Sequence, residues 1–121
     1  MQDETLFAKR IRIGRLYDVY GSLLTARQQK IMEQYFYDDL SLGEIADAGG
    51  TSRQAVYDLL KRVEESLEKY EKKLRVLQKE ESIQFELRGA LHLLGALTEE
   101  GLGDERLQKI EDIIRKVMGD A

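Results

Sequence analysis

LGEIADAGGTSRQAVYDLLK, at residues 42–61, carries the strongest structural signal in the chain. Its apolar and small residues recur at helical spacing on both sides of a glycine pair, which is typical of two short helices joined by a tight turn. Ala46 provides the small side chain that two crossing helices need at their contact, and Gly50 tolerates a positive φ in the turn. The stretch predicts a helix-turn-helix, whose expected core residues are Ile45, Ala46, Gly50, Val56 and Leu59.

Two capping boxes upstream predict where the preceding helices begin. Ser41 with Glu44 marks the start of the first helix of the pair, and Thr25 with Gln28 marks the start of the helix before it. In each box, the side chain of each residue can accept a hydrogen bond from the backbone amide of the other. A further helix is expected over residues 5–20, ended by Gly21, and its apolar side is expected to carry Leu6, Ile13, Leu16, Tyr17 and Tyr20.

Downstream of the turn, one long helix is expected. It begins at Thr51 or Ser52 and meets no breaking residue before about Glu81. Its apolar residues follow one another at alternating steps of four and three, which forms a continuous seam. The flanking residues do not favour a parallel coiled coil, so we expect the seam to pack on the tail of the same chain, with a homodimer as the alternative. After Val56, the seam consists of Leu60, Val63, Leu67, Tyr70, Leu74 and Leu77.

The helical pattern predicts an all-α chain in two parts. Residues 1–78 form the expected helix-turn-helix domain with its long helix, and residues 79–121 form a helical extension packed on this domain or on a partner. In the extension, an apolar run from Phe85 to Leu97 precedes a turn at residues 98–103, and Asp104 caps a last helix. The apolar edge of that helix is expected to comprise Leu107, Ile110, Ile114 and Val117.

Composition argues against several classes of function. The chain has no cysteine, one histidine, no cluster of metal ligands and no phosphate-binding glycine loop, so we expect no enzyme, no metal and no cofactor. His92 is expected to pack within its apolar run. That run is too short to span a bilayer, and the first residues do not form a signal peptide. We therefore expect a cytoplasmic protein without membrane contact.

The charge distribution permits DNA binding but not strong binding. The net charge is −4, yet residues 1–62 hold nine basic and nine acidic side chains, so the whole deficit lies in residues 63–121. A neutral first half can still present a basic face, and weak to moderate, salt-sensitive binding is expected. If the second helix of the pair enters the major groove, the residues facing DNA are Ser52, Arg53, Gln54, Tyr57, Lys61 and Arg62.

These side chains suit distinct contacts with double-stranded DNA. Arg53 can bind guanine and Gln54 can bind adenine, each through two hydrogen bonds. Ser52 and the amides at the helix start suit a phosphate oxygen, whereas Lys61 and Arg62 would add salt-sensitive phosphate contacts.

Three neighbouring residues have alternative interpretations. Gln54 can instead close a capping box with Thr51. Tyr57 can contact a thymine methyl group or a phosphate, or pack against the helix of residues 25–36. Asp58 would repel phosphate and limit the affinity.

Several motifs together resemble one family. The most specific is SRQAVYD at residues 52–58, and the others are LYDVYG at 16–21, LTARQQ at 24–29, LSLGEIA at 40–46 and EKYEKKL at 68–74. Over residues 13–77 the chain resembles the YlxM-like family of small bacterial helix-turn-helix proteins, which is itself similar to the fourth region of bacterial sigma factors. The Gly49-Gly50-Thr51 turn departs from the bulkier turn of the family. The resemblance implies DNA binding through Ser52, Arg53, Gln54, Tyr57 and Lys61.

The genes of this family adjoin those of the signal recognition particle. The resemblance therefore implies regulation of that pathway or of its operon. A protein–protein adaptor is the alternative function, in which the acidic tail docks the basic RNA-binding component of the particle. The expected partners are thus double-stranded DNA, a second copy of the chain, and components of the signal recognition particle.

Overall fold

The computed structural model describes residues 2–101 and 104–119. Every regular element in these two ranges is a helix, which confirms the predicted all-α fold. The chain divides into two compact units, one ending at Leu77 and one beginning at Gln78. The elements are α1 (Gln2–Tyr20), the short 3-10 helix η1 (Gly21–Leu23), α2 (Ala26–Phe36), α3 (Leu42–Gly49), α4 (Arg53–Leu74), α5 (Val76–Glu99) and α6 (Glu105–Met118).

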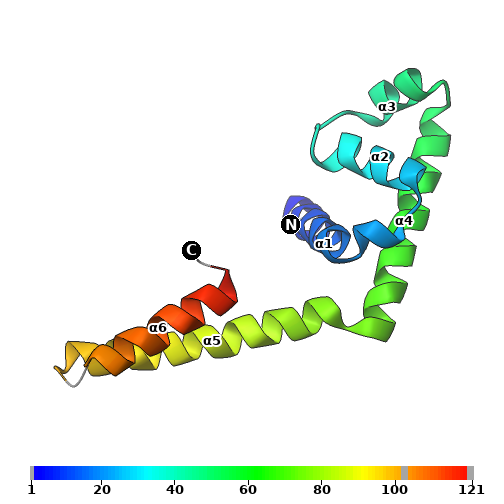
Figure 1. Cartoon of the computed structure of the whole chain (residues 1–121). Helices are drawn as coiled ribbons and strands as arrows, with labels where there is room; N and C mark the ends of the chain where they lie inside the picture. The colour runs from blue at the N-terminus through cyan, green and yellow to red at the C-terminus, as the bar shows by residue number, and fades with distance from the viewer. Residues whose placement is uncertain (1, 102–103, 120–121) are drawn as a thin grey trace. The chain divides into compact units, whose positions relative to one another are not determined.

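Helix α4 forms the spine of the first unit. Helices α1, α2 and α3 all pack against it, with α3 near its beginning and α1 nearer its end (Figure 1). Val63 and Leu67 in its seam are completely buried. The seam is thus covered by helices that precede it in the chain, rather than by the tail or the partner that its pattern suggested. The buried core comprises Ile13, Leu16, Tyr20, Leu24, Ile31, Met32, Ile45, Ala46, Val56, Leu60, Val63, Leu67 and Leu77.

The predicted helix caps are confirmed, although α1 begins at Gln2 and not at residue 5. Thr25 and Gln28 exchange hydrogen bonds between side chain and backbone at 3.2 and 3.0 Å, and Ser41 and Glu44 do so at 3.1 Å in both directions. The Asp104 carboxylate likewise accepts the first amides of α6. These residues act within a few positions of each other, so local sequence alone determines them.

The end of the long helix differs from the prediction. We expected it to run to about Glu81, but α4 ends at Leu74, and Arg75 adopts the left-handed conformation with a φ of 54°. A new helix, α5, begins at Val76. As a result the predicted seam is interrupted, because Leu74 is half exposed while Leu77 is buried from the start of α5.

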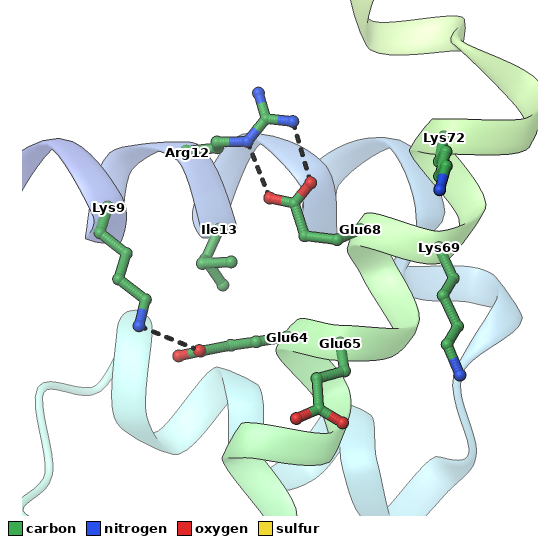
Figure 2. A pocket seen from close by; sticks show the side chains of 8 residues that line it. All are labelled: Lys9, Arg12, Ile13, Glu64, Glu65, Glu68, Lys69 and Lys72. Atoms are coloured by element: carbon green, nitrogen blue, oxygen red, sulfur yellow. Dashed lines mark hydrogen bonds and ion pairs between the residues drawn. The ribbon is translucent and has the colours of Figure 1, made fainter.

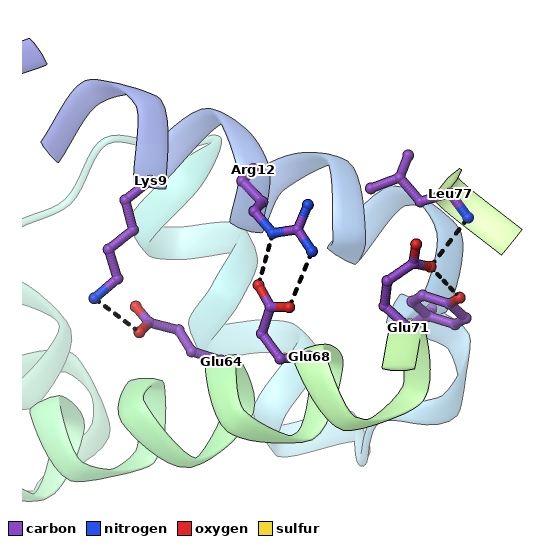
Figure 3. Close-up of polar contacts among 7 residues, drawn as sticks. Lys9, Arg12, Glu64, Glu68, Glu71 and Leu77 are labelled. Atoms are coloured by element: carbon purple, nitrogen blue, oxygen red, sulfur yellow. Dashed lines mark hydrogen bonds and ion pairs between the residues drawn. The ribbon is translucent and has the colours of Figure 1, made fainter. Parts of the chain in front are cut away.

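A set of buried hydrogen bonds explains this break. The Tyr20 hydroxyl of α1 donates to Glu71 Oε1 at 2.5 Å and accepts a hydrogen bond from the Val76 amide at 3.1 Å. Glu71 Oε1 also accepts a hydrogen bond from the Leu77 amide at 3.1 Å (Figure 3). These amides would otherwise bond to carbonyl groups one turn earlier in a continuous helix. We call Tyr20, Glu71, Val76 and Leu77 the latch, since a side chain far away in the sequence stops α4 at this point.

Ion pairs border the contact between α1 and α4. Lys9 Nζ lies 3.4 Å from Glu64, and Arg12 binds Glu68 through two hydrogen bonds of 2.8 and 3.0 Å (Figure 3). All four side chains are partly exposed, so each pair contributes little free energy but helps to set the register of the two helices. Leu6, expected on the apolar side of α1, is 64% exposed, and burial on this helix begins only at Ile13.

The second unit is a hairpin of α5 and α6 without a buried interior. The Gln84 side chain near the start of α5 donates to the Met118 carbonyl at the end of α6 at 3.4 Å, so the two helices run in opposite directions. On the predicted edge of α6, Leu107 and Ile114 are half-buried, whereas Ile110 and Val117 are exposed. Residues 102 and 103 of the expected turn lie outside the described ranges.

We predict that Tyr20→Phe lowers the free energy of unfolding by about 1–3 kcal/mol, because it leaves the Glu71 carboxylate and the Val76 amide without their buried partner. Urea titration followed by circular dichroism measures this. Tyr37→Phe is the control, since it removes a hydroxyl that bonds Asp18 at 2.7 Å on an exposed side chain, and a loss below about 1 kcal/mol is expected. Equal losses in both variants would contradict the importance of the latch.

The latch also predicts a dependence of stability on alkaline pH. Burial, the hydrogen bond to Glu71 and the charge of that carboxylate raise the pKa of Tyr20 above its ordinary value. The neutral tyrosine therefore stabilises the fold fully below pH 10, and this contribution is lost as the pH rises through the raised pKa. The stability of Tyr20→Phe should fall less steeply above pH 10 than that of the unaltered chain.

Candidate nucleic-acid interface

The turn between α3 and α4 has the geometry of a helix-turn-helix. α3 ends at Gly49, and Gly50 takes the left-handed conformation with a φ of 64° while its amide bonds the Ala46 carbonyl. The Thr51 amide bonds the same carbonyl at 3.0 Å. Ser52 then caps α4, its hydroxyl accepting the Ala55 amide at 3.1 Å. Because the cap is Ser52 and not Thr51, the alternative in which Gln54 closes a capping box with Thr51 is wrong.

The predicted helix-turn-helix core lies where the two helices meet. Ile45 and Ala46 of α3 and Val56 of α4 are almost completely buried, and Leu59 is half-buried against them. This packing fixes the first turns of α4 relative to α3 and leaves the opposite side of α4 open. The predicted contact residues are all exposed, and we call them the recognition surface: Ser52, Arg53, Gln54, Tyr57, Lys61 and Arg62.

Arg53 lies against the first turn of α3. A methyl group on Gly43 would be only 2.9 Å from Arg53 Nε and 3.1 Å from its Nη2, so the guanidinium occupies the space that a side chain at position 43 would fill. Glycine at this position therefore permits the guanidinium to rest on the α3 backbone. The sequence pattern had identified Arg53 but gave no indication of its relation to Gly43.

Three further side chains of the recognition surface contact neighbouring side chains of α4. Gln54 Nε2 donates to Asp58 Oδ1 at 2.9 Å, and Lys61 Nζ lies 5.7 Å from the centre of the Tyr57 ring. Asp58 thus holds the amide that was predicted to bind adenine. Binding of a base by Gln54 would require this amide to turn away from Asp58.

Two basic residues of α2 border the same region and were missed by the sequence interpretation. Arg27 and Lys30 are exposed and line a cleft of about 270 Å³ that extends to Gly49 and Thr51. Arg27 also lines a second cleft, of about 440 Å³, together with Asp58 and Arg62 of α4. Their three-residue spacing on one helix was a signal, but only the packing of α2 on α3 and α4 brings Arg27 beside Arg62 and Lys30 beside the turn.

A separate groove of about 440 Å³ lies between α1 and α4 (Figure 2). Ile13 lies in it between Lys9 and Arg12, which are paired with Glu64 and Glu68. The paired charges neutralise each other, which makes this groove less suited to an anionic ligand than the recognition surface. Its lining residues are Lys9, Arg12, Ile13, Glu64, Glu65, Glu68, Lys69 and Lys72.

No three histidine, cysteine or acidic residues within residues 2–101 and 104–119 come together as metal ligands. His92, for which packing was expected, is exposed on α5. None of the helices in the described part of the chain is long and apolar enough to cross a membrane.

Comparison with known proteins gives consistent matches. Residues 7–114 match the model of UPF0122, which describes helix-turn-helix proteins like YlxM and p13. A UPF0122 protein of Shouchella clausii is 54% identical over 86 residues, covering 69% of this chain and 79% of the relative. Those of Desulforamulus reducens and Bacillus mycoides are both 44% identical, covering 88% and 93% of this chain and 91% and 99% of the relatives.

We predict opposite effects of Gly43→Ala on stability and on DNA binding. Alanine favours the helical backbone and should raise the free energy of unfolding by up to about 1 kcal/mol. Its methyl group should also displace the Arg53 guanidinium and weaken DNA binding, by less than the about 1–3 kcal/mol expected for loss of a base-contacting arginine. Urea unfolding and fluorescence anisotropy measure the two effects.

Gly49→Ala is the matched control. A methyl group there meets only Thr51, at an ordinary distance of 3.9 Å, and does not approach Arg53. It should leave DNA binding unchanged. Unchanged DNA binding in Gly43→Ala as well would show that the position of the guanidinium is unimportant for binding.

Proposed function

Because the chain belongs to the UPF0122 family of YlxM/p13-like helix-turn-helix proteins, we propose that it binds double-stranded DNA through the recognition surface and regulates transcription. The observation that carries this proposal is the exposed polar side of α4, which begins directly after a well-packed turn. A helix presented in this way fits the major groove with its first turns toward the bases.

Each part of the surface has a proposed task. Arg53 binds a guanine edge, and its rest position on α3 limits the number of conformations that it loses on binding. Ser52 with the first amides of α4 contacts a phosphate. Tyr57 contacts a thymine methyl group or a phosphate, and Gln54 binds adenine after release from Asp58.

Positive charge at the edges of the surface supports contacts with the DNA backbone. Lys61 is exposed on α4, Arg62 shares a cleft with Arg27 of α2, and Lys30 lines the cleft beside the turn. We propose that all four contact phosphates. Asp58 opposes them, and together with the neutral charge of residues 1–62 it keeps the affinity moderate and strongly dependent on salt.

The regulated target is proposed to be the signal recognition particle pathway or the operon that encodes it, as the resemblance to the YlxM-like family implies. The protein would act in the cytoplasm as a non-enzymatic regulator. A homodimer would present two recognition surfaces to two half-sites, which compensates for a weak contact at each one.

An adaptor function is the second candidate, and the second unit favours it. Residues 78–121 hold ten acidic and six basic side chains, and the α5–α6 hairpin exposes many apolar ones. Such a surface suits a basic protein partner, for which we propose the RNA-binding component of the signal recognition particle. DNA binding would then be secondary.

DNA binding is tested by fluorescence anisotropy with the DNA upstream of the chain's own operon, at two salt concentrations. Arg53→Ala should weaken binding to a specific site by about 1–3 kcal/mol. Lys61→Ala should weaken binding to all sequences alike and reduce the slope of log affinity against log salt by about 1. Binding that is absent in the unaltered chain, or indifferent to Arg53, would refute the proposal.

The adaptor function is tested with a chain that ends at Gln78, which retains the complete core of the first unit. If the second unit docks the particle, binding to its purified protein component should be lost in this chain, whereas its folded first unit should keep the helical content expected of residues 1–78 by circular dichroism. Unchanged binding to that component would exclude docking through residues 79–121. Leu67→Asp is unsuitable for this purpose, because Leu67 is completely buried and the charge would unfold the first unit.

A further inference from the structure

The α5–α6 hairpin carries two parallel apolar stripes, of which only one is used within the hairpin. The inner stripe is half-buried: on α5 it includes Leu87, Leu91 and Leu94, and on α6 Leu107 and Ile114. The outer stripe lies beside it and is mostly exposed. Its members are Ile83 (55% exposed), Ala90, Leu93 (68%) and Leu97 (38%) on α5, and Ile110 (44%), Ile113 (61%) and Val117 (65%) on α6.

The spacing of the outer stripe is that of a helical bundle. Ile83, Ala90 and Leu97 are seven residues apart on α5, and Leu93 lies between the last two at steps of three and four. Ile110, Ile113 and Val117 follow the same steps on α6. A helix with two adjacent stripes at this spacing has two helical neighbours, as in a four-helix bundle. Within the hairpin, α5 and α6 are neighbours of each other, so each of them still lacks its second neighbour.

The missing neighbours can come from a second hairpin of the same kind. We propose that two copies of the chain associate through their outer stripes, so that two α5–α6 hairpins form a four-helix bundle. A two-fold axis brings identical surfaces together. The same outer stripe, which spans α5 and α6, therefore forms the contact surface of each copy. Two helices with no buried residue between them also need such a partner, because so small a unit does not form a stable core alone.

The charges beside the outer stripe favour a second copy as its occupant. On α5, Glu86 lies between Ile83 and Ala90 and Glu100 lies one turn after Leu97, whereas Lys79, one turn before Ile83, is basic. On α6, Lys109 and Lys116 lie one turn before and after Ile113. When α5 of one copy lies against α6 of the other, the edge that carries Glu86 and Glu100 and the edge that carries Lys109 and Lys116 have opposite charge. This surface completes the homodimer proposed above, but it does not depend on DNA binding.

Sedimentation equilibrium of the full chain tests the bundle. The unaltered chain should have twice its monomer mass of 14.0 kDa at micromolar concentration. Leu93→Lys and Ile113→Lys replace exposed residues of the outer stripe and should each weaken the dimer by about 100-fold or more. At concentrations high enough for the variants themselves to dimerise, circular dichroism should show the helical content of the unaltered chain.

Phe85→Lys is the matched control. Phe85 is 74% exposed, but it lies two residues after Ile83 and hence on another side of α5. This variant should change the dimer dissociation constant by no more than about threefold. A monomeric unaltered chain would overturn the proposal, since the stripe would then be covered by the same chain or by another protein. Equal weakening by Phe85→Lys would also overturn it.

The same variants separate this proposal from DNA binding. Arg53→Ala should remain dimeric, because Arg53 belongs to the first unit. A dimer that fails to bind DNA would refute the proposed function alone, and a monomer that binds DNA through Arg53 would refute the bundle alone.

Discussion

The burial of one side of α4 determines the arrangement of the first unit. Val56, Leu60, Val63 and Leu67 follow each other along this side, and α1, α2 and α3 all pack against it with their buried residues. The same burial exposes the opposite side of the helix, where the polar residues of its first turns are found. The core and the recognition surface thus share a single helix. Any rotation of α4 about its axis would move both of them.

Features that depend on nearby residues could be predicted from the sequence, and features that depend on distant ones could not. The caps at Thr25, Ser41 and Asp104 follow from side chains within three positions, and the helix-turn-helix follows from a short run of small and apolar residues. The break at Arg75 has no such local cause. It depends on Tyr20, which is far away in the chain and whose role only the packed structure reveals.

The candidate site shows the same division. The pattern placed six residues on the exposed side of α4, since helical spacing alone separates that side from the core. It did not reveal that Arg53 rests on Gly43 or that α2 contributes Arg27, because both relations join helices whose mutual arrangement the pattern does not specify. For Gln54, the pattern suggested a capping partner at Thr51, but the cap formed one residue later.

The double role of α4 also has a mechanical consequence. A helix of its 22 residues is about 33 Å long and bends little over that length, so it acts as a lever between its two ends. A tilt of about 5° around the end held by Glu71 displaces the end that carries Arg53 by about 3 Å, more than the tolerance of a hydrogen bond to a base. The side-chain bonds that stop the helix at one end therefore govern how accurately DNA can be read at the other.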